Sequence, residues 1–466
     1  MKKIKYLVTY LILLIFMICF TGCSKQTYYY IIDEGNVIIT GINNKTKSIV
    51  IPNEIDGLPV NQIGSYAFAN ANIDYLELPD SIVIINEFAF YEANINIKSL
   101  NLPASLEEIG QNAFISCNWL EEVNIGKNVK KIATTAFYDC INLSKITVSE
   151  DNKVYKAIDN VLYSGNSLVL YPNGKKDAFF KLDDKITQIY DYAFANNQYI
   201  EEIEINDTSN LLVIGEACFL NCSKLEHIDL PKLLFQIGQN AFKLCIALKK
   251  ITLGELMVDI SYGLFRGCNS LEEINLLGNI SSIGAYAFSE TKWLKEKQAE
   301  NDLVIVSKIL IDGENAKGDI IIPNEVEGIA ANAFINNTKI TSLVLNYKCQ
   351  YIDTSAFKGC DSLENISFYE TSLKTIGYKA FEGCTSLTQV LIPRGVNTIM
   401  GSAFADCACL NLVIIPNTVL YIKGGAFTNG ASSMIVYTDF EEIPSTWSTK
   451  IVDDGITVLT NKKLGY

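Results

Sequence analysis

Histidine is almost absent from this chain, which has a single one, His227, among 466 residues. A Ser-His-Asp or Cys-His catalytic arrangement could be built only around that residue, and its sequence neighbours offer no nucleophile elbow. Zinc sites that use several histidines are excluded. Because His227 falls in a predicted strand at a position that faces solvent, we expect an ordinary surface side chain.

Long apolar runs are also scarce, and the one that approaches the length of a membrane span is Tyr6–Phe20. It follows a basic start with three lysines. About 15 residues suit the core of a signal peptide better than a membrane span, which needs roughly 20. We therefore interpret residues 1–22 as an export signal; the alternative is an N-terminal anchor helix that stays attached. No second run of spanning length follows, so the remainder is expected to be soluble and tethered.

The end of that segment reads Phe20-Thr21-Gly22-Cys23. These four residues resemble a bacterial lipoprotein box, with Phe20 where leucine is most often found. The resemblance implies cleavage before Cys23, lipid attachment to its thiol and localisation at the bacterial cell membrane or cell surface.

Positive charge is in short supply as well. The chain has 38 Lys and Arg against 52 Asp and Glu, and loss of the three lysines in residues 1–22 leaves 35, a formal charge of −17. Nucleic-acid binding depends on neutralising phosphates with Lys and Arg, so we expect no nucleic-acid partner. Adhesion to anionic lipid by charge alone is also disfavoured. The only predicted membrane contact is the N-terminal lipid.

What the chain does have is a repeat. The hexapeptide Ile-Gly-Gln-Asn-Ala-Phe occurs at residues 109–114 and again at 237–242, and twelve looser versions accompany it. Successive phenylalanines are 22 to 25 residues apart, except for two spacings of 57 and 46. Such a period predicts a solenoid rather than independent domains. The fourteen phenylalanines are Phe68, Phe90, Phe114, Phe137, Phe194, Phe219, Phe242, Phe265, Phe288, Phe334, Phe357, Phe381, Phe404 and Phe427.

The rest of the unit is visible around each phenylalanine. A cysteine often stands three residues later, followed by x-x-Leu and then x-x-Ile/Val-x-Leu, as in Cys268 to Leu276. Alternation in that last piece predicts a short strand, and the Ala-Phe segment predicts a tight helical turn. These units resemble BspA-type leucine-rich repeats over residues 30–445. The resemblance implies an α/β solenoid, a right-handed leucine-rich-repeat array with a parallel β-sheet along one face, short helical turns and inserted β-hairpins.

The two long spacings and the chain ends give the predicted organisation. Two β-rich runs flank Ser164-Gly165-Asn166, which is typical of a hairpin, and the second gap combines a helix-like start with a β-rich run. Solenoid ends need covers, which resemble the terminal segments of the family. The segments are a lipoprotein signal peptide (1–22), a tether and N-terminal β cap (23–60), a first repeat block (61–150), a hairpin insertion (151–180), a second block (181–292), an insertion or cap-like unit (293–320), a third block (321–430) and a C-terminal cap (431–466).

Cysteine is frequent, with 13 residues, and eight of them occupy one repeat position. Metal or redox chemistry is one interpretation of such regularity, and disulfides are another. Neighbouring rungs would hold parallel side chains about 4.8 Å apart, whereas a disulfide needs facing Cβ atoms nearer 3.8 Å. We therefore expect buried free thiols that act as small apolar groups, with no metal and no cofactor. The eight are Cys117, Cys140, Cys222, Cys245, Cys268, Cys360, Cys384 and Cys407.

Carboxylates are plentiful, and glycoside hydrolysis needs only two of them. Pairs such as Glu201-Glu202 and Glu272-Glu273 sit at one repeat position, however, so we interpret them as solvated ladder residues. No phosphate-binding loop is present. An enzyme is not expected, and an active site in residues 154–172 or 293–318 is the remaining alternative.

The surface of the predicted strands therefore carries the functional expectation. Outward positions are polar along the first rungs, including Glu202, Glu204, His227 and Asp229, and turn apolar at Leu391, Leu412 and Ile414. Exposed apolar patches often mark partner sites; the alternative is that the C-terminal cap covers these three. The family resemblance implies adhesin-like binding of protein or glycan ligands on host or bacterial surfaces. A structural envelope lipoprotein is the other interpretation, and the oligomeric state is not indicated.

Overall fold

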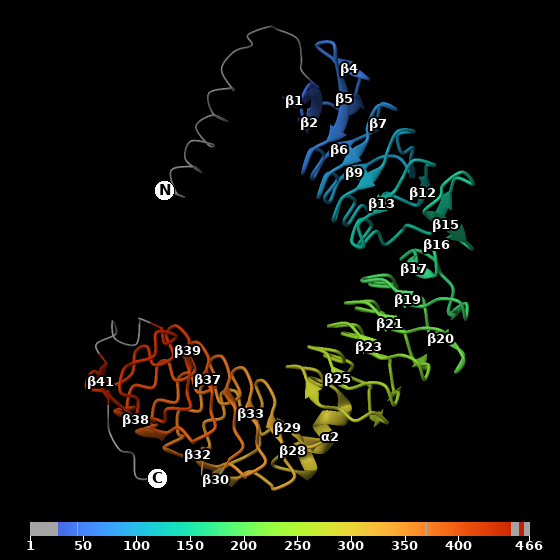
Figure 1. Ribbon diagram of the computed structural model, residues 1–466. Helices are drawn as coiled ribbons and strands as arrows, with labels where there is room; N and C mark the ends of the chain where they lie inside the picture. Colours follow the sequence, from blue (N-terminus) through green and yellow to red (C-terminus); the bar gives the residue numbers. More distant parts are fainter. Residues whose placement is uncertain (1–26, 44, 369–370, 449–455, 461–466) are drawn as a thin grey trace.

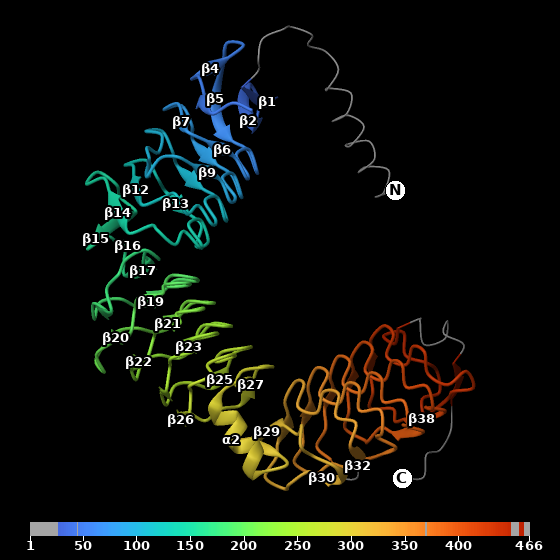
Figure 2. The same cartoon turned by 180° about the vertical axis from the view of Figure 1, so that it is seen from behind.

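The computed structural model describes residues 27–43, 45–368, 371–448 and 456–460. These residues wind into a β-solenoid that bends into an open arc, with the N-terminal and C-terminal rungs on opposite arms (Figures 1 and 2). The predicted signal segment 1–22 and the predicted lipidation site Cys23 lie outside the described residues. No helix in the described part is long and apolar enough to cross a membrane.

Most rungs contribute two short strands, so the solenoid has two series of parallel strands where the sequence predicted one sheet. Each series is divided among several small sheets, and we call each series a ladder. The first, the short ladder, is formed by the residues just before each Ala-Phe turn. Their second residue is buried because it faces the core, as Ile85 and Ile109 do. The short ladder consists of β5 (Leu58–Ile63), β8 (Ile84–Ile85), β11 (Glu108–Ile109), β13 (Lys131–Ile132), β17 (Ser167–Leu170), β19 (Gln188–Ile189), β21 (Val213–Ile214), β23 (Gln236–Ile237), β25 (Asp259–Ile260), β27 (Ser282–Ile283), β29 (Ile309–Asp312), β31 (Gly328–Ile329), β33 (Tyr351–Ile352), β35 (Thr375–Ile376), β37 (Thr398–Ile399) and β39 (Tyr421–Ile422).

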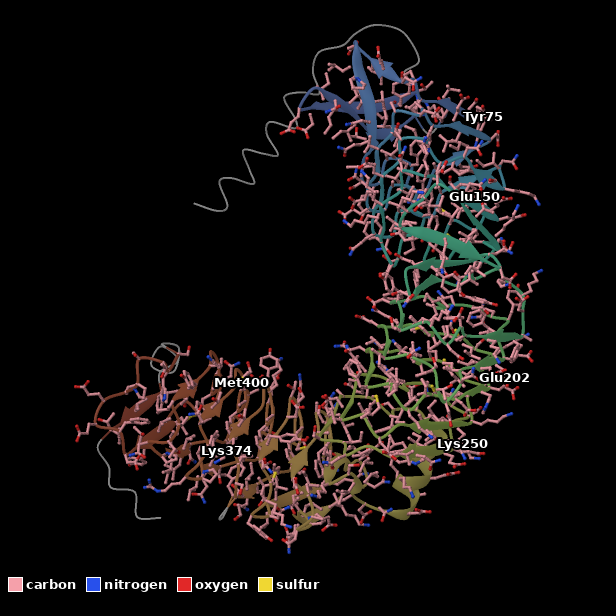
Figure 3. All side chains as sticks on the ribbon, turned by 45° about the vertical axis from the view of Figure 1, so that its right-hand side comes forward. Tyr75, Glu150, Glu202, Lys250, Lys374 and Met400 are labelled. Carbon is pink, nitrogen blue, oxygen red and sulfur yellow. The ribbon has the colours of Figure 1, made fainter. Side chains whose placement is uncertain are left out.

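The second, the outer ladder, is the strand predicted from the alternating segment. Its labelled residues Tyr75, Glu202 and Lys250 lie on the outer side of the arc, whereas Met400, next to an Ala-Phe turn, lies on the inner side (Figure 3). The outer ladder consists of β3 (Ser48–Val50), β7 (Tyr75–Glu77), β10 (Ser99–Leu100), β12 (Glu122–Ile125), β14 (Lys145–Val148), β18 (Phe179–Lys181), β20 (Glu202–Glu204), β22 (His227–Ile228), β24 (Lys250–Leu253), β26 (Glu273–Leu276), β30 (Gly318–Ile321), β32 (Ile340–Val344), β34 (Asn365–Ser367), β36 (Gln389–Leu391), β38 (Leu412–Ile415), β40 (Ile435–Thr438) and β41 (Thr457–Leu459).

The remaining elements lie at the N-terminus and at the two long spacings. β1 (Tyr28–Asp33) and β2 (Asn36–Ile42) form an antiparallel hairpin. β2 pairs in parallel with β5 and so extends the short ladder, and β4 (Glu54–Ile55) pairs with β5 in antiparallel orientation. The small strands β6 (Asn72–Ile73) and β9 (Asn94–Ile95) pair with each other. β15 (Tyr155–Ile158) and β16 (Val161–Ser164) add antiparallel strands to β17. The helix α2 (Lys292–Glu300) and β28 (Val304–Val306) precede β29.

The predicted hairpins are present. β16 and β17 are antiparallel and join through Gly165 and Asn166, the residues from which the turn was predicted. β17 then pairs in parallel with β19, so this insertion extends the short ladder and starts the next block. In the second insertion, β28 and β29 form the hairpin, and β29 starts the third block by pairing with β31.

The Ala-Phe segments are chains of tight turns, not the helical turns that the sequence predicted. The residue two before the phenylalanine has positive φ in every rung except the β-branched Thr135, and the residue two after it has positive φ in all of them. Examples are Asn112 (φ 54) and Ser116 (φ 57) around Phe114. Two left-handed residues four positions apart prevent a continuous right-handed helix, because they redirect the backbone at each turn.

The turns stack on one another through the backbone. The amide of Phe90 donates to the carbonyl oxygen of Ala113 in the next rung at 2.7 Å, and the amide of Phe114 donates to that of Ala136 at 2.8 Å. Because alternate backbone groups bond between rungs, the segment satisfies its polar groups without forming a helix.

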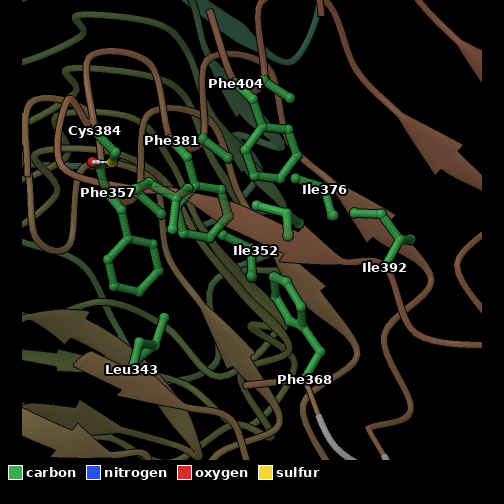
Figure 4. Packing of buried hydrophobic residues seen from close by; sticks show 14 of the residues in the cluster. Leu343, Ile352, Phe357, Phe368, Ile376, Phe381, Cys384, Ile392 and Phe404 are labelled. Atoms are coloured by element: carbon green, nitrogen blue, oxygen red, sulfur yellow. Dashed lines mark hydrogen bonds between the residues drawn. The ribbon is translucent and has the colours of Figure 1, made fainter. Parts of the chain in front are cut away.

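Stacked phenylalanine rings form the middle of the core. Phe357, Phe381 and Phe404 are parallel within 4° and have centroids 5.1 Å apart (Figure 4). The buried residues divide into three clusters, whose boundaries fall at the two insertions: Val37 to Leu170, Val161 to Ala330 and Leu310 to Ile456. The interior is therefore built from three arrays joined end to end.

Candidate binding surface

The cysteines at the common repeat position are structural. Each of the eight donates its thiol hydrogen to the carbonyl oxygen of the phenylalanine in the preceding rung, as Cys384 does to Phe357 at 3.2 Å (Figure 4). All described cysteines are free, and every one except Cys409 is buried. Burial raises the pKa of the thiols, that of Cys117 to about 12. The expectation of buried free thiols is confirmed.

Asparagine replaces cysteine in the first rung after each insertion. The side-chain amide of Asn337 donates to the carbonyl oxygens of Gly313 and Ala316, at 2.8 and 2.9 Å, and its Oδ1 accepts from the amide of Lys339 at 2.8 Å. Asn197 makes equivalent bonds to the first insertion. An amide has more donors and acceptors than a thiol and can satisfy an irregular preceding rung. In both forms the side chain at this position hydrogen-bonds to backbone carbonyl oxygens of the preceding segment.

The charged residues of the outer ladder pair with one another across rungs. Parallel register places Glu122 beside Lys145, and their charged groups are 2.8 Å apart. Glu273 and Lys250 form the same pair at 2.7 Å, and this ion pair lowers the pKa of Glu273. Exposed pairs of this kind contribute little to stability, because solvent and salt screen them. The consequence for binding is that many ladder charges already have a partner within the chain.

Of the four predicted polar candidates, Glu202 and Glu204 lie on β20, His227 lies on the adjacent β22, and Asp229 directly follows β22. Glu202 is directly beside His227 in the register, and both are exposed. Glu204 pairs with Lys181 of the preceding strand. His227 Nε2 is 3.2 Å from Asp229 Oδ2, so the single histidine is an exposed side chain next to a carboxylate.

The three predicted apolar candidates lie in a four-stranded sheet made of β36, β38, β40 and β41. Its register places Leu391, Ile414, Tyr437 and Leu459 side by side in one outward row, which we call the apolar row. Leu391 is 39% exposed, and the other three are partly exposed. Leu412 begins a parallel row beside Gln389 and Ile435. The C-terminal strands thus extend the sheet and its apolar row rather than simply ending it.

Sequence reasoning missed Tyr437 and Leu459. The alternation of Ile435, Val436 and Tyr437 was visible, but the segment was interpreted as a cap whose strands would end the solenoid. The same alternation predicts one buried and two outward residues, and the structure has Val436 buried between two partly exposed neighbours.

Two cavities lie at the insertions. One of about 200 Å³ is next to Leu294 of α2 and Asp312, whose pKa is raised by burial. The other, of about 300 Å³, lies between Tyr163 of the hairpin and Phe179 and Lys181 of the outer ladder. Within the described residues no group of three or more His, Cys, Asp or Glu side chains could hold a metal ion.

Comparison with protein families places these features in context. The protein-family model of the BspA type leucine rich repeat region matches this sequence at residues 42–168, 187–314 and 314–434, in six copies. The chain belongs to this family. The BspA-type match extends over the three arrays but leaves residues 169–186, at the first insertion, unmatched. The leucine-rich-repeat solenoid is typically a non-enzymatic, protein-binding fold.

Several solved structures are similar to this BspA-type chain. A leucine-rich repeat protein from Eubacterium ventriosum is 19% identical, with 90% of this chain and 94% of that chain covered and a TM-score of 0.43. One from Bacteroides ovatus is 21% identical, with 95% and 99% covered and a TM-score of 0.36. The pneumococcal vaccine antigen PcpA is 17% identical, with 94% and 98% covered and a TM-score of 0.39. A search of the curated proteins gave no match.

Proposed function

We propose that the protein is exported, is held at the bacterial cell surface by a lipid on Cys23, and binds protein or glycan ligands of host or bacterial surfaces without covalent chemistry. Membership of the BspA-type family supports a binding role. This adhesin-like function assigns no catalysis, cofactor or metal to the chain. A purely structural envelope lipoprotein is the competing function.

The apolar row is the observation that carries the proposal. Elsewhere on the outer ladder, outward residues of neighbouring strands are often ion-paired, as Lys145 is with Glu122. In the apolar row, the uncharged residues Leu391, Ile414 and Tyr437 occupy the equivalent outward positions, so they form no ion pairs with one another. When a partner covers contiguous exposed apolar side chains, the removal of that surface from water lowers the free energy and favours binding.

Charge insertion into the apolar row tests this role. We expect the double variant Leu391→Glu with Ile414→Glu to lose at least about tenfold in affinity for any ligand that the full chain captures from matrix proteins and glycans, because a carboxylate would be buried at the contact. The matched control is Ile321→Glu with Val344→Glu, an equivalent cross-strand pair on the same ladder. Equal affinity of the two variants for the ligand would show that the apolar row is not part of the contact. Capture of no ligand at all would favour the structural lipoprotein.

The lipid anchor has its own test. We expect Cys23→Ala to move the chain from the membrane fraction to the medium or the soluble envelope fraction, because a double acyl anchor binds membranes stably and the rest of the chain offers little attraction to anionic lipid. Fractionation of the producing cells followed by mass spectrometry of the N-terminal peptide measures this. A variant that stays in the membrane fraction would show that residues 1–22 remain attached as an anchor helix.

A further inference from the structure

Three aromatic side chains gather on the turns of the first two rungs. Tyr66 and Phe88 stack with centroids 5.0 Å apart and ring planes within 2° of parallel. Tyr91 contacts the edge of Phe88, with centroids 6.1 Å apart. Tyr66 is 54% exposed, and Phe88 and Tyr91 are partly exposed. We call Tyr66, Phe88 and Tyr91 the aromatic platform.

The backbone under this platform is one that aromatic residues seldom adopt. Tyr66 has φ 61 and Phe88 has φ 56, at the repeat position two before the core phenylalanine. Several other rungs have Asn or Gly at that position, such as Asn112, Asn240 and Gly263, which take left-handed backbone at least cost. Tyr192 and Tyr286 are the other aromatic residues there. Bulky residues in this region are outliers, and such outliers cluster at ligand contacts. Rung folding alone does not require a ring at either position.

Carboxylates border the platform, and cations are missing around it in the sequence. Glu92 accepts a hydrogen bond from the hydroxyl of Tyr91 and raises its pKa, and Glu87 directly precedes Phe88 with its side chain exposed. Residues 48–97 form the longest stretch of the chain without Lys or Arg. The first basic residue after it, Lys98, is engaged with Glu121 at 3.0 Å. The acidic residues of this stretch are Glu54, Asp56, Asp74, Glu77, Asp80, Glu87 and Glu92.

Several other exposed tyrosines, namely Tyr286, Tyr347, Tyr378 and Tyr421, have a cation of the chain over the ring. Arg266 lies 5.2 Å from the ring centroid of Tyr286, which has the same repeat position and left-handed backbone as Tyr66. Lys379 covers Tyr378 at 5.4 Å, and Lys423 covers Tyr421 at 5.3 Å. In the described part of the chain, no Lys or Arg of the chain covers Tyr66 or Phe88 in this way.

We propose that the aromatic platform is a binding site for a cationic side chain, Arg or Lys, presented by a basic segment of a partner protein. The ring faces attract the cation, and Glu87 and Glu92 supply the opposite charge. Guanidinium also stacks on aromatic planes, so arginine fits the stacked pair best. This inference rests on the proposed binding role and adds the chemistry of one partner, at a site far along the chain from the apolar row.

The experiment uses the full-length chain in detergent and a fluorescein-labelled nona-arginine peptide, with fluorescence anisotropy as the readout. A nona-citrulline peptide serves as the uncharged analogue. The double variant Tyr66→Asn with Phe88→Asn removes the rings and introduces the residue that other rungs have at this position, so its melting temperature should not fall. We expect its dissociation constant for nona-arginine to rise roughly tenfold. We also expect the unmodified chain to bind nona-citrulline much more weakly.

Tyr286→Asn is the matched control, because it removes a ring of the same type and backbone conformation that Arg266 already covers. We expect unchanged binding for it. A second measurement at about 0.5 M salt screens long-range attraction by the acidic surface and leaves the close ring contacts.

Equal binding by the unmodified chain and the Tyr66→Asn with Phe88→Asn variant would overturn the site and leave only general charge attraction. Preference for a neutral chito-oligosaccharide probe over nona-arginine at this platform would overturn the cationic ligand. Neither result touches the broader binding role, which the apolar-row variants test separately.

Discussion

Replacement of Phe381 with alanine is expected to destabilise the C-terminal array by about 4 kcal/mol. Its ring is fully buried and stacks between Phe357 and Phe404, with both centroids 5.1 Å away. The ring of Phe368 is nearly perpendicular to that of Phe381, and their centroids are 6.3 Å apart. Alanine would remove contacts on both sides and leave a cavity that two neighbouring rungs cannot close without moving, because the backbone bonds between rungs fix their spacing.

Amide hydrogen exchange in a urea series is the appropriate measurement, because a long repeat array is not expected to unfold in one step. We expect the exchange free energy to fall for peptides within residues 351–427 and to change little in the first array. Tyr378→Ala is the control, since this ring belongs to the same rung but is 45% exposed, and its effect should stay within about 0.5 kcal/mol. Equal effects of the two substitutions would contradict the stacked core.

Gly238→Ala, in the second copy of the repeated hexapeptide, is expected to destabilise the middle array by about 2 kcal/mol. A Cβ at this position would overlap the backbone of the preceding rung, at the amide nitrogen of Glu216 and the carbonyl carbon of Gly215. Backbone atoms cannot rotate away as a side chain can, so the rungs would have to separate. Gly110 of the first copy is also confined, though less tightly, with an added Cβ 2.8 Å from the amide nitrogen of Glu87.

Gly126→Ala is the matched control for this prediction. It has no atom within 4 Å of an added Cβ, and its φ lies outside the left-handed region. Alanine there should be neutral or stabilise by about 0.5 kcal/mol, because it restricts the unfolded chain. Thermal melts of the two variants measure the difference. If the Gly238→Ala and Gly126→Ala variants had the same melting temperature, close contact between rungs would not be the reason for glycine at position 238.

The repeated residues could be predicted from the sequence because their spacing is independent of fine geometry. A phenylalanine and a cysteine that recur with one period must meet the same neighbours in every rung, and Phe114 and Cys117 do so. The turns could not be predicted in the same way. Ala-Phe segments contain good helix formers, and only the frequent Asn, Asp and Gly at the flanking positions, such as Asn196 and Gly267, indicated left-handed backbone.

The candidate surfaces were predictable in part. Strand alternation identified Leu391 and Ile414 as outward residues, which the structure confirms, and whether they bind a partner stays a prediction. The pairing of Glu204 with Lys181 depends on which strands are neighbours across the hairpin insertion, and this pairing was not visible in the sequence. The aromatic platform was missed because Tyr66 and Phe88 lie in a segment interpreted as a helical turn, where a ring has no special meaning.

The central claim is that the residues repeated from rung to rung build the interior, whereas the residues that vary carry the function. The reactivity of the cysteines tests this claim most directly. A thiol reacts through its thiolate, and burial both shields the repeat-position cysteines and raises their pKa, for Cys360 to about 12. The decisive measurement is iodoacetamide labelling of the folded chain at about pH 8, followed by mass spectrometry of the cysteine peptides. We expect rapid labelling of Cys409 alone among the described cysteines in the folded chain, and of all of them after unfolding. Rapid labelling of the repeat-position cysteines in the folded chain, or thiols that stay blocked after unfolding, would contradict this structure-based account of the repeat.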